Sequence, residues 1–439
     1  MQRMKSPKIH TTFDEKVRIF SCEYLKCCIY ISNSDSFECP FTKDLFARLV
    51  STSVMLEDFL DFHGAKNNKD WYFYRELASA VRHLSLAGFS QIHILNRLIF
   101  YDLQDTEVLR KEGRATLYFL KNSLIKLASV IIDEAKYLNI PIPTEKYDIS
   151  SFPSITSSEI LEYNIDGEED TTELQKKSIV RIASQFLSIA ANFDSLAFYK
   201  PYDIEGILAI VPEKVNEVEI RRFEMLVHNL QSSFDTNVIH GDYRFGDREL
   251  KQFRGVLSVI FYLLKMTGRL LHFYERHLHI NSYKNTYQKA KECLEHILDY
   301  EVMLDRTINY GLFSVCRSFS KGEKLAKEIL NKNVERSYIT VGIPLKMGFH
   351  SRPSLLVAKV VEHYGGQVEL RVKDDRFDAG SVLDIQWAGG KIQKEKIKEV
   401  VFQGDSRALK DIKILAGVNY GEDMMGKGVS LPMELKYLR

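Results

Sequence analysis

The residues whose types and spacing could do chemistry stand together in the segment from Gly348 to Ser354. Pro353 suits the first turn of a helix, where its missing N–H leaves no hydrogen bond unmade. His350 then falls at the N-cap, with the free backbone amides of Ser351 and Arg352 beside its ring. A helix start offers unpaired donors and positive potential, which favour a bound phosphate and a neutral, nucleophilic imidazole. Because Arg352 adds a cationic fork for phosphoryl oxygens, the segment predicts a histidine that carries a phosphoryl group.

The elements around this segment must place it between a strand and a helix. Residues 341–439 hold 12 of the 23 glycines, and from residue 338 short apolar runs replace helical spacing. The pattern predicts strand 338–344, helix 353–363, a hairpin that starts with strand 367–372 and turns at 373–375, helix 381–387 ending at Gly389-Gly390, strand 397–403 and helix 406–415. The resulting order is β-α-β-β-α-β-α, for which helices covering one face of a small antiparallel sheet are the natural packing.

This region, about 337–420, resembles the histidine-containing phosphocarrier (HPr) family of the bacterial phosphoenolpyruvate-dependent sugar phosphotransferase system. The resemblance rests on Gly-Phe-His-Ser-Arg-Pro, close to the family's Gly-Leu-His-Thr/Ala-Arg-Pro, and on the order of strands and helices. Ser381 also follows His350 by 31 residues, the separation of the family's regulatory serine. The resemblance implies an open-faced α+β sandwich, a phosphoacceptor at His350, a phosphate contact at Arg352 and a modified serine at Ser381.

Three features depart from the family's pattern. Phe349 and Ser354 replace the commoner Leu and Ala, changes that alter packing. Gly380 precedes the serine where a longer residue is frequent, which bears on recognition of Ser381 by a kinase. The tail, 421–439, extends past the family's end.

The resemblance also implies a role and a set of partners. Enzyme I would transfer phosphate from phosphoenolpyruvate to His350, a downstream acceptor would receive it, and HPr kinase/phosphorylase would modify Ser381. Such a protein is a carrier and not a turnover enzyme, and it needs no cofactor or metal. A different class of function stays open, namely a helical sensor or scaffold whose HPr-like domain is a docking module without transfer.

The preceding 336 residues predict a large, mostly α-helical part. Apolar residues recur at helical spacing over 43–63, 75–86, 105–138, 173–193, 215–234, 247–279, 283–310 and 318–331. The stretch 139–172 is rich in proline, serine and acidic residues and predicts a linker or long surface loop. We therefore expect a multidomain protein with a helical domain at 1–138, a linker at 139–172, a second helical domain at 173–336, the HPr-like domain at 337–420 and a tail at 421–439.

Other motifs in the helical part favour structural roles. The His-Gly-Asp string at 240–242 is found in small-molecule kinases, but Asp247 stands where such kinases need asparagine and instead suits a helix N-cap. The segment 76–96, with Gly88 between two predicted helices, loosely matches a helix-turn-helix. His272, His277 and His279 lie on or beside one long helix, where no neighbouring carboxylate in the sequence completes a metal site.

Composition excludes several classes of function. The formal net charge is +1, whereas proteins that neutralise many phosphates usually have a basic excess, so nucleic-acid binding is not expected. The six cysteines, including the Cys22/Cys27/Cys28/Cys39 group, lack zinc-finger spacing and fit reduced cytosolic thiols. The N-terminus has no signal-peptide pattern, and charged residues interrupt the most apolar window, 256–273. We expect a cytoplasmic protein without a membrane span.

Overall fold

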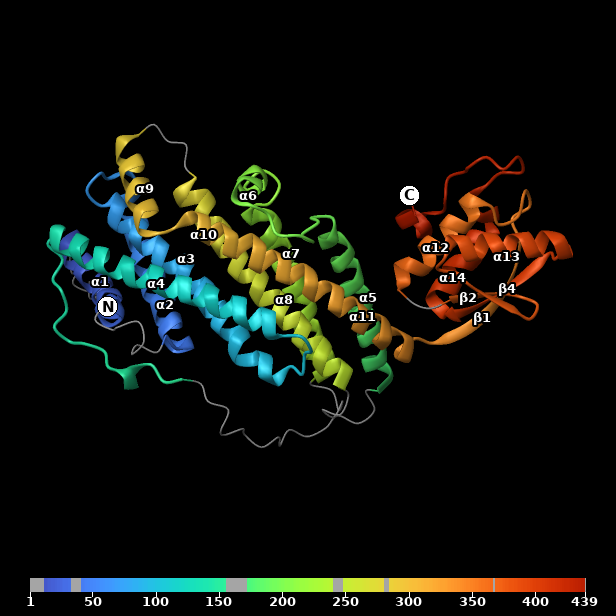
Figure 1. Ribbon diagram of the computed structural model, residues 1–439, viewed down its shortest axis with the longest axis horizontal. Helices are drawn as coiled ribbons and strands as arrows, with labels where there is room; N and C mark the ends of the chain where they lie inside the picture. Colours follow the sequence, from blue (N-terminus) through green and yellow to red (C-terminus); the bar gives the residue numbers. More distant parts are fainter. Residues whose placement is uncertain are drawn as a thin grey trace, which may run out of the picture. The chain divides into compact units, whose positions relative to one another are not determined.

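The computed structural model describes residues 12–32, 41–154, 172–239, 248–279, 284–365 and 368–438, and most of them are helical (Figure 1). The helices are α1 (Phe13–Ser32), α2 (Lys43–Phe62), α3 (Tyr72–Arg97), α4 (Glu107–Tyr137), α5 (Thr172–Asp194), α6 (Ile204–Ile210), α7 (Glu217–Phe234), α8 (Arg248–Phe273), α9 (Asn285–Ile297), α10 (Tyr300–Asp305), α11 (Phe313–Asn333), α12 (Ser351–Tyr364), α13 (Val382–Glu395) and α14 (Ser406–Gly417). The strands are β1 (Arg336–Gly342), β2 (Val368–Val372), β3 (Asp375–Asp378) and β4 (Glu399–Asp405). The prediction of a mostly helical chain with a small C-terminal α+β part is confirmed at this level.

The chain divides into two compact units. Unit 1 comprises Met1–Ile165, Leu196–His228 and Gly255–Phe319, and unit 2 comprises Asp166–Ser195, Asn229–Arg254 and Ser320–Arg439. Within unit 1, α2 packs against α1 and α3, and α4 packs against the same two helices. These helices bury a continuous set of apolar side chains, among them Leu45, Leu56, Leu84 and Leu124, all with no exposed surface. Burial of one apolar face on each helix holds this part of the unit together.

The helix ends predicted at Gly88 and at Gly389 are wrong for the same physical reason. Helix α3 runs through Gly88, and a Cβ atom there would lie 2.2 Å from Cε1 of Phe46 on α2. Ser90, expected to cap a new helix, instead donates to the Leu86 carbonyl inside α3. Helix α13 likewise continues past Gly389, where a Cβ would lie 3.0 Å from the Phe349 carbonyl oxygen. Glycine serves here for close approach and not for termination, so a helix-turn-helix at 76–96 is excluded.

Replacing Gly88 with alanine is expected to lower the free energy of unfolding by about 1–3 kcal/mol, the usual cost of overpacking a core. The gain of about 1 kcal/mol in helix propensity does not compensate for a contact this close. Gly268→Ala is the matched control, because its nearest neighbour would be Ile220 Cγ2 at an ordinary 3.7 Å. Urea unfolding of both variants checks the packing, and a Gly88→Ala protein as stable as wild type would contradict it.

Other helix boundaries also differ from expectation. The predicted helix 283–310 is divided at Asp299, whose Oδ1 accepts from the Val302 amide at 3.0 Å and caps α10. The predicted break between 310 and 318 is absent, because a π-helical segment, Arg306–Leu312, leads directly into α11. Helices α1 and α6 were not predicted. The motif at 240–242, Asp247, Cys39 and residues 155–171 of the expected linker lie outside the described residues.

Two helical stretches are long and apolar enough to cross a membrane. They are Glu107–Tyr137 and Arg248–Leu278, and 44% and 78% of their most apolar windows are buried within the structure. The core helix of a protein that never meets a membrane passes the same test, so this is weak evidence. The second stretch contains the apolar window 256–273, which charged residues interrupt.

The C-terminal part of unit 2 has the predicted order β-α-β-β-α-β-α. Its sheet is fully antiparallel with strand order β1-β4-β2-β3, and Leu370 of β2 lies opposite Phe402 of β4. Along β2 and β4 buried residues alternate with half-exposed ones, and the buried set joins apolar residues of α12, α13 and α14 in one core. The three helices therefore cover one face of the sheet, as the sequence predicts.

The tail is part of this fold. Leu435 and Leu438 belong to the core, and Tyr437 stacks on His363 with ring centroids 3.8 Å apart. The hydroxyl of Tyr437 donates a hydrogen bond to Asp411 Oδ2 at 2.6 Å. His363 is partly buried in this stack, and its burial lowers its pKa. These contacts anchor the end of the described chain and fix the path of the residues between Tyr420 and Leu435.

Candidate functional site

His350 lies at the start of α12, as the sequence predicts. It is the N-cap residue, with an extended backbone (φ −82°, ψ −170°), and its carbonyl accepts the first helical bond from Ser354 at 3.1 Å. Pro353 is buried in the first turn. The His350 side chain makes no capping bond to the helix amides. The ring is therefore placed beside unpaired donors without being engaged by them.

The loop before His350 has an unusual backbone. Met347 and Gly348 both adopt φ +60°, and the His350 amide donates to the Gly348 carbonyl at 2.9 Å. A positive φ costs a non-glycine residue free energy and persists only where the surrounding structure imposes it. Here the loop is held from outside, because Lys346 Nζ donates to the Met425 carbonyl at 2.8 Å and Leu345 donates to Asn419 Oδ1 at 2.9 Å.

Met425 belongs to residues 421–429, which we call the tail hairpin, and Asn419 lies just before it. Its two arms meet at a bridge between Glu422 and Gly428, and Val429 donates to the Gly421 carbonyl at 3.0 Å. Asp423 closes the turn, since its Oδ1 accepts from the amides of Met425 and Lys427 at 2.8 and 2.7 Å. The hairpin thus presents a fixed backbone to the loop and to the start of α12.

Glu422 brings a buried carboxylate to His350. Its side chain is 1% exposed, and its Oε1 and Oε2 lie 3.0 and 3.1 Å from His350 Nε2, whose side chain is 28% exposed. An ionised carboxylate only accepts, so Nε2 carries the proton and donates it toward Glu422. In the neutral ring Nδ1 then holds the lone pair, and no described residue provides Nδ1 with a hydrogen bond. The pair selects one tautomer and leaves one nitrogen for chemistry.

Arg352 is exposed and lies against the other arm of the tail hairpin. A Cβ atom on Gly428 would stand 1.8 Å from Nη1 and 2.6 Å from Cζ of Arg352. The guanidinium therefore lies directly over the backbone of Gly428, next to the turn of helix that begins at His350. From there its fork is free to meet the oxygens of an anion at the start of α12.

Ser351 and Ser381 lie at the starts of two helices that pack together, α12 and α13. Ser351 is exposed, and its Oγ accepts from Gln386 Nε2 at 3.3 Å. Ser381 is the N-cap of α13, where its side chain accepts from the Asp384 amide at 3.3 Å. Ser381 thus stands at the start of the helix, as predicted, and the residue is half-exposed.

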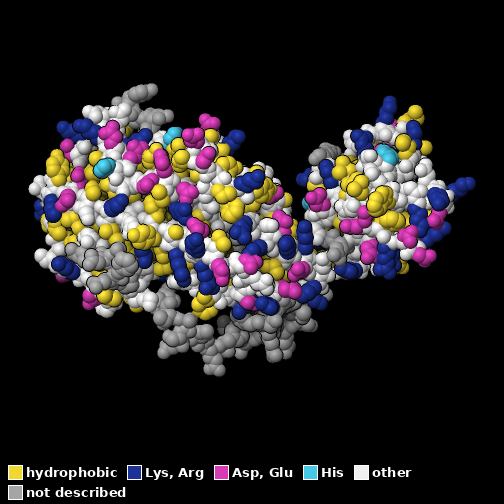
Figure 2. All heavy atoms as spheres, viewed as in Figure 1, with side chains coloured by type: hydrophobic (Ala, Val, Ile, Leu, Met, Phe, Trp, Pro, Cys, Tyr) yellow, Lys and Arg dark blue, Asp and Glu magenta, His cyan; other side chains and the backbone are white. Residues whose placement is uncertain are grey.

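Exposed apolar side chains come from the elements that carry these residues. Figure 2 shows hydrophobic side chains gathered on the C-terminal α+β part, and several of the elements around His350 supply exposed ones. They are Leu345 and Met347 in the loop, Leu383 and Trp387 on α13, and Met424 and Met425 in the tail hairpin, all at least 65% exposed. An apolar surface of this kind favours contact with another protein.

Sequence reasoning placed His350, Ser351, Arg352 and Ser381 on the correct elements but missed Glu422 and Gly428. A glutamate among 19 residues beyond the recognised domain gives no sign of burial, and only the tertiary path of the tail reveals it.

In the cysteine group, Cys22, Cys27 and Cys28 are free thiols, and burial raises the pKa of Cys27 to about 12.

Comparison with known proteins found nothing similar. No protein-family model, no curated protein and no solved structure matches the chain. The chemistry of the site therefore has to be argued from its own residues.

Proposed function

We propose that the C-terminal α+β part is a phosphocarrier module of the HPr type and that His350 accepts the phosphoryl group. The observation that carries the proposal is the placement of the His350 ring at the N-cap of α12, with Nε2 at Glu422 and Nδ1 without a partner among the described residues. The motif at 348–353 and the order of strands and helices support it. In this proposal enzyme I donates the group, a downstream acceptor receives it, and the protein acts in the cytoplasm.

The proposed transfer would use this geometry in the following way. Nδ1 uses its lone pair to attack phosphorus, and the bond from phosphorus to the donor breaks as the Nδ1–P bond forms. Positive charge then develops on the imidazole, and Glu422 stabilises it or takes the Nε2 proton. Arg352 and the first amides of α12 meet the phosphoryl oxygens. Positioning and electrostatic stabilisation would supply the catalysis. The same groups would serve both when His350 receives the phosphoryl group and when it passes the group on.

The experiment that tests the proposal is phosphorylation of the purified full chain by phosphoenolpyruvate and enzyme I. The expected product is phosphate that is stable in alkali and labile in acid, because a phosphorus–nitrogen bond on imidazole hydrolyses when the ring is protonated. A chain that takes up no such phosphate while a known HPr does so in the same mixture would contradict the proposal.

A second site of the proposal is Ser381, as a position for regulation by HPr kinase/phosphorylase. Phosphate there adds about −1.5 to −2 charges beside Leu383 and Trp387, at the start of α13. The start of the helix accommodates the negative charge, so the fold stays stable. The phosphate instead weakens the binding of enzyme I to this surface. We expect Ser381→Asp, with one charge, to slow phosphorylation of His350 a few-fold, and added salt to restore part of the rate. Equal rates at low and high salt would leave Ser381 as a helix cap only.

A docking module without transfer is the second candidate, and the tail hairpin is the observation that favours it. The hairpin contacts both His350 and Arg352, the two side chains that transfer would use. If it stays closed in solution, the apolar surface around it would still bind a partner protein. In that case the chain would bind enzyme I or another protein without taking up acid-labile phosphate.

A further inference from the structure

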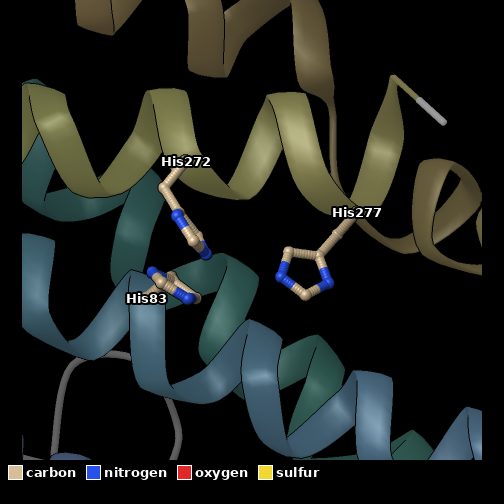
Figure 3. A group of neighbouring side chains, drawn as sticks. All are labelled: His83, His272 and His277. Carbon is tan, nitrogen blue, oxygen red and sulfur yellow. The ribbon is translucent and has the colours of Figure 1, made fainter. Parts of the chain in front are cut away.

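A group of buried histidines lies in unit 1, among elements that the proposed phosphocarrier site does not include. His83 belongs to α3, His272 to α8, and His277 to the π-helical segment Tyr274–Leu278 that follows α8. Figure 3 shows the three rings turned toward one another across the gap between α3 and α8. One ring nitrogen from each residue lies within 4.8 Å of the other two. Residues nearly 200 positions apart in the chain thus bring their donor atoms to one point.

His83 has no partner for either of its ring nitrogens. The residue has no exposed surface, and neither Nδ1 nor Nε2 makes a hydrogen bond within the described part of the chain. Native proteins rarely leave a buried polar group unpaired, because the lost hydration is not replaced. Such a side chain indicates a ligand at this point.

Two buried carboxylates hold the other rings in the orientation that a metal ligand needs. Glu76 Oε2 forms a hydrogen bond of 2.6 Å with Nδ1 of His277. Glu217 Oε2 lies 2.8 Å from Nδ1 of His272, close enough for an ion pair but without hydrogen-bond geometry. A carboxylate that accepts a hydrogen bond from Nδ1–H keeps the proton on Nδ1 and leaves the lone pair on Nε2, and metal-binding histidines commonly have such a partner. No carboxylate is close to His272 or His277 in the sequence, because α3 and the start of α7 supply Glu76 and Glu217.

Most neighbouring charges are already paired and leave the ring nitrogens as the available metal ligands. The exception is Arg269, whose positive charge also acts on His83 and which makes no ion pair within the described residues. Arg75 makes ion pairs with Glu57, Asp61 and Glu76 at 2.7 to 2.9 Å. Arg221 pairs with Glu217 at 2.9 Å. His277 Nε2 also lies 3.2 Å from the hydroxyl of Ser79, a neutral contact that a metal would displace.

We propose that His83, His272 and His277 bind one divalent transition-metal ion, with Glu76 and Glu217 as the carboxylates that orient two of the rings. Three imidazoles suit Zn²⁺, Co²⁺ or Ni²⁺ and not the oxygen-preferring Mg²⁺ or Ca²⁺. Tetrahedral Zn–N bonds of about 2.0–2.1 Å place ligand atoms about 3.3 Å apart, so the nitrogens have to move closer and the stacked rings have to turn out of their parallel arrangement. His83 and His272 now stack with centroids 4.3 Å apart, and the ion replaces this contact. The bound ion would join α3 to the end of α8.

The experiment is titration of the chelator-treated full chain with Zn²⁺, followed by calorimetry, and with Co²⁺, followed by visible absorption. We expect one ion per chain with a dissociation constant in the micromolar range or tighter, a raised unfolding temperature, and Co²⁺ bands of a nitrogen-ligated site. His83→Leu keeps a similar volume and removes both unpaired nitrogens, so it should fold as well as wild type. His83→Leu and the half-buried His272→Ala should each weaken binding by at least about 100-fold.

A control must separate this site from adventitious binding. Cys293 and His296 are exposed and lie three residues apart on α9, where surface ligands could capture Zn²⁺. His296→Ala should leave the affinity and the Co²⁺ spectrum unchanged. The proposal is overturned if the wild-type chain binds no ion in this range, if folded His83→Leu and His272→Ala bind as wild type does, or if binding is lost in His296→Ala alone.

Discussion

A chain with glutamine at position 350 is expected to take up no acid-labile phosphate from phosphoenolpyruvate and enzyme I. The substitution removes Nδ1, which is the nucleophile in the proposed transfer. The amide NH₂ of glutamine still donates a hydrogen bond, so Glu422 keeps a partner. Loss of labelling in a folded His350→Gln protein therefore reports on the acceptor and not on the fold.

Alanine at the same position has an additional effect. It leaves the carboxylate of Glu422, which is 1% exposed, without a partner, and an unpaired buried charge is strongly destabilising. His350→Ala should therefore unfold more readily than His350→Gln, while His350→Ala/Glu422→Ala should recover part of the stability. His363→Gln is the matched control in the same unit, and it should be labelled as wild type is. Labelling that survives in His350→Gln would show that another residue accepts the phosphate.

The second large effect is expected at Glu422, which we propose to be a positioning residue. In Glu422→Gln the side-chain oxygen still accepts from His350 Nε2, but the negative charge is gone. A hydrogen bond to a charged group is worth about 1.5–3 kcal/mol. If that energy is realised as the ring becomes positive, the rate of phosphorylation should fall by about 10- to 150-fold. Glu422→Asp keeps the charge at a shorter reach and should restore part of the rate.

The stability of the Glu422→Gln protein distinguishes a positioning role of Glu422 in transfer from a purely structural role. A buried carboxylate beside a neutral imidazole is costly, so Glu422→Gln should unfold at the same urea concentration as wild type or at a higher one. Slower transfer without lower stability identifies a charge retained for function. Glu434→Gln, an exposed glutamate in the same tail, is the control that should change neither property. Wild-type transfer rates in Glu422→Gln would contradict the role of the carboxylate.

Local signals in the sequence predicted much of the fold. Thr42 accepts from the Leu45 amide and Ser381 from the Asp384 amide, and both caps depend only on residues within one turn. The alternation in β2 and β4 and the helical spacing of α12 and α14 likewise arise from one buried face on each element. Such features are visible in a short window of sequence.

The failures have a common cause in contacts between distant residues. Gly88 is needed for the approach of Phe46, 42 positions earlier, and a window around residue 88 contains only a helix breaker. Glu422 reaches His350 across 72 residues, and His277 reaches Glu76 across 201. Burial of a carboxylate or an imidazole is decided by this packing, so residue type and spacing alone do not reveal the partner.

The central claim is that Nδ1 of His350 forms the bond to phosphorus while Nε2 faces Glu422. The most direct measurement is to phosphorylate the ¹⁵N-histidine-labelled chain with phosphoenolpyruvate and enzyme I and to read the ring nitrogens by NMR. We predict one phosphohistidine, with phosphorus coupled to Nδ1 and with Nε2 either protonated or hydrogen-bonded to the Glu422 carboxylate. The phosphohistidine signal should be absent in His350→Gln. Phosphorus on Nε2, on another histidine, or on no histidine at all would contradict it.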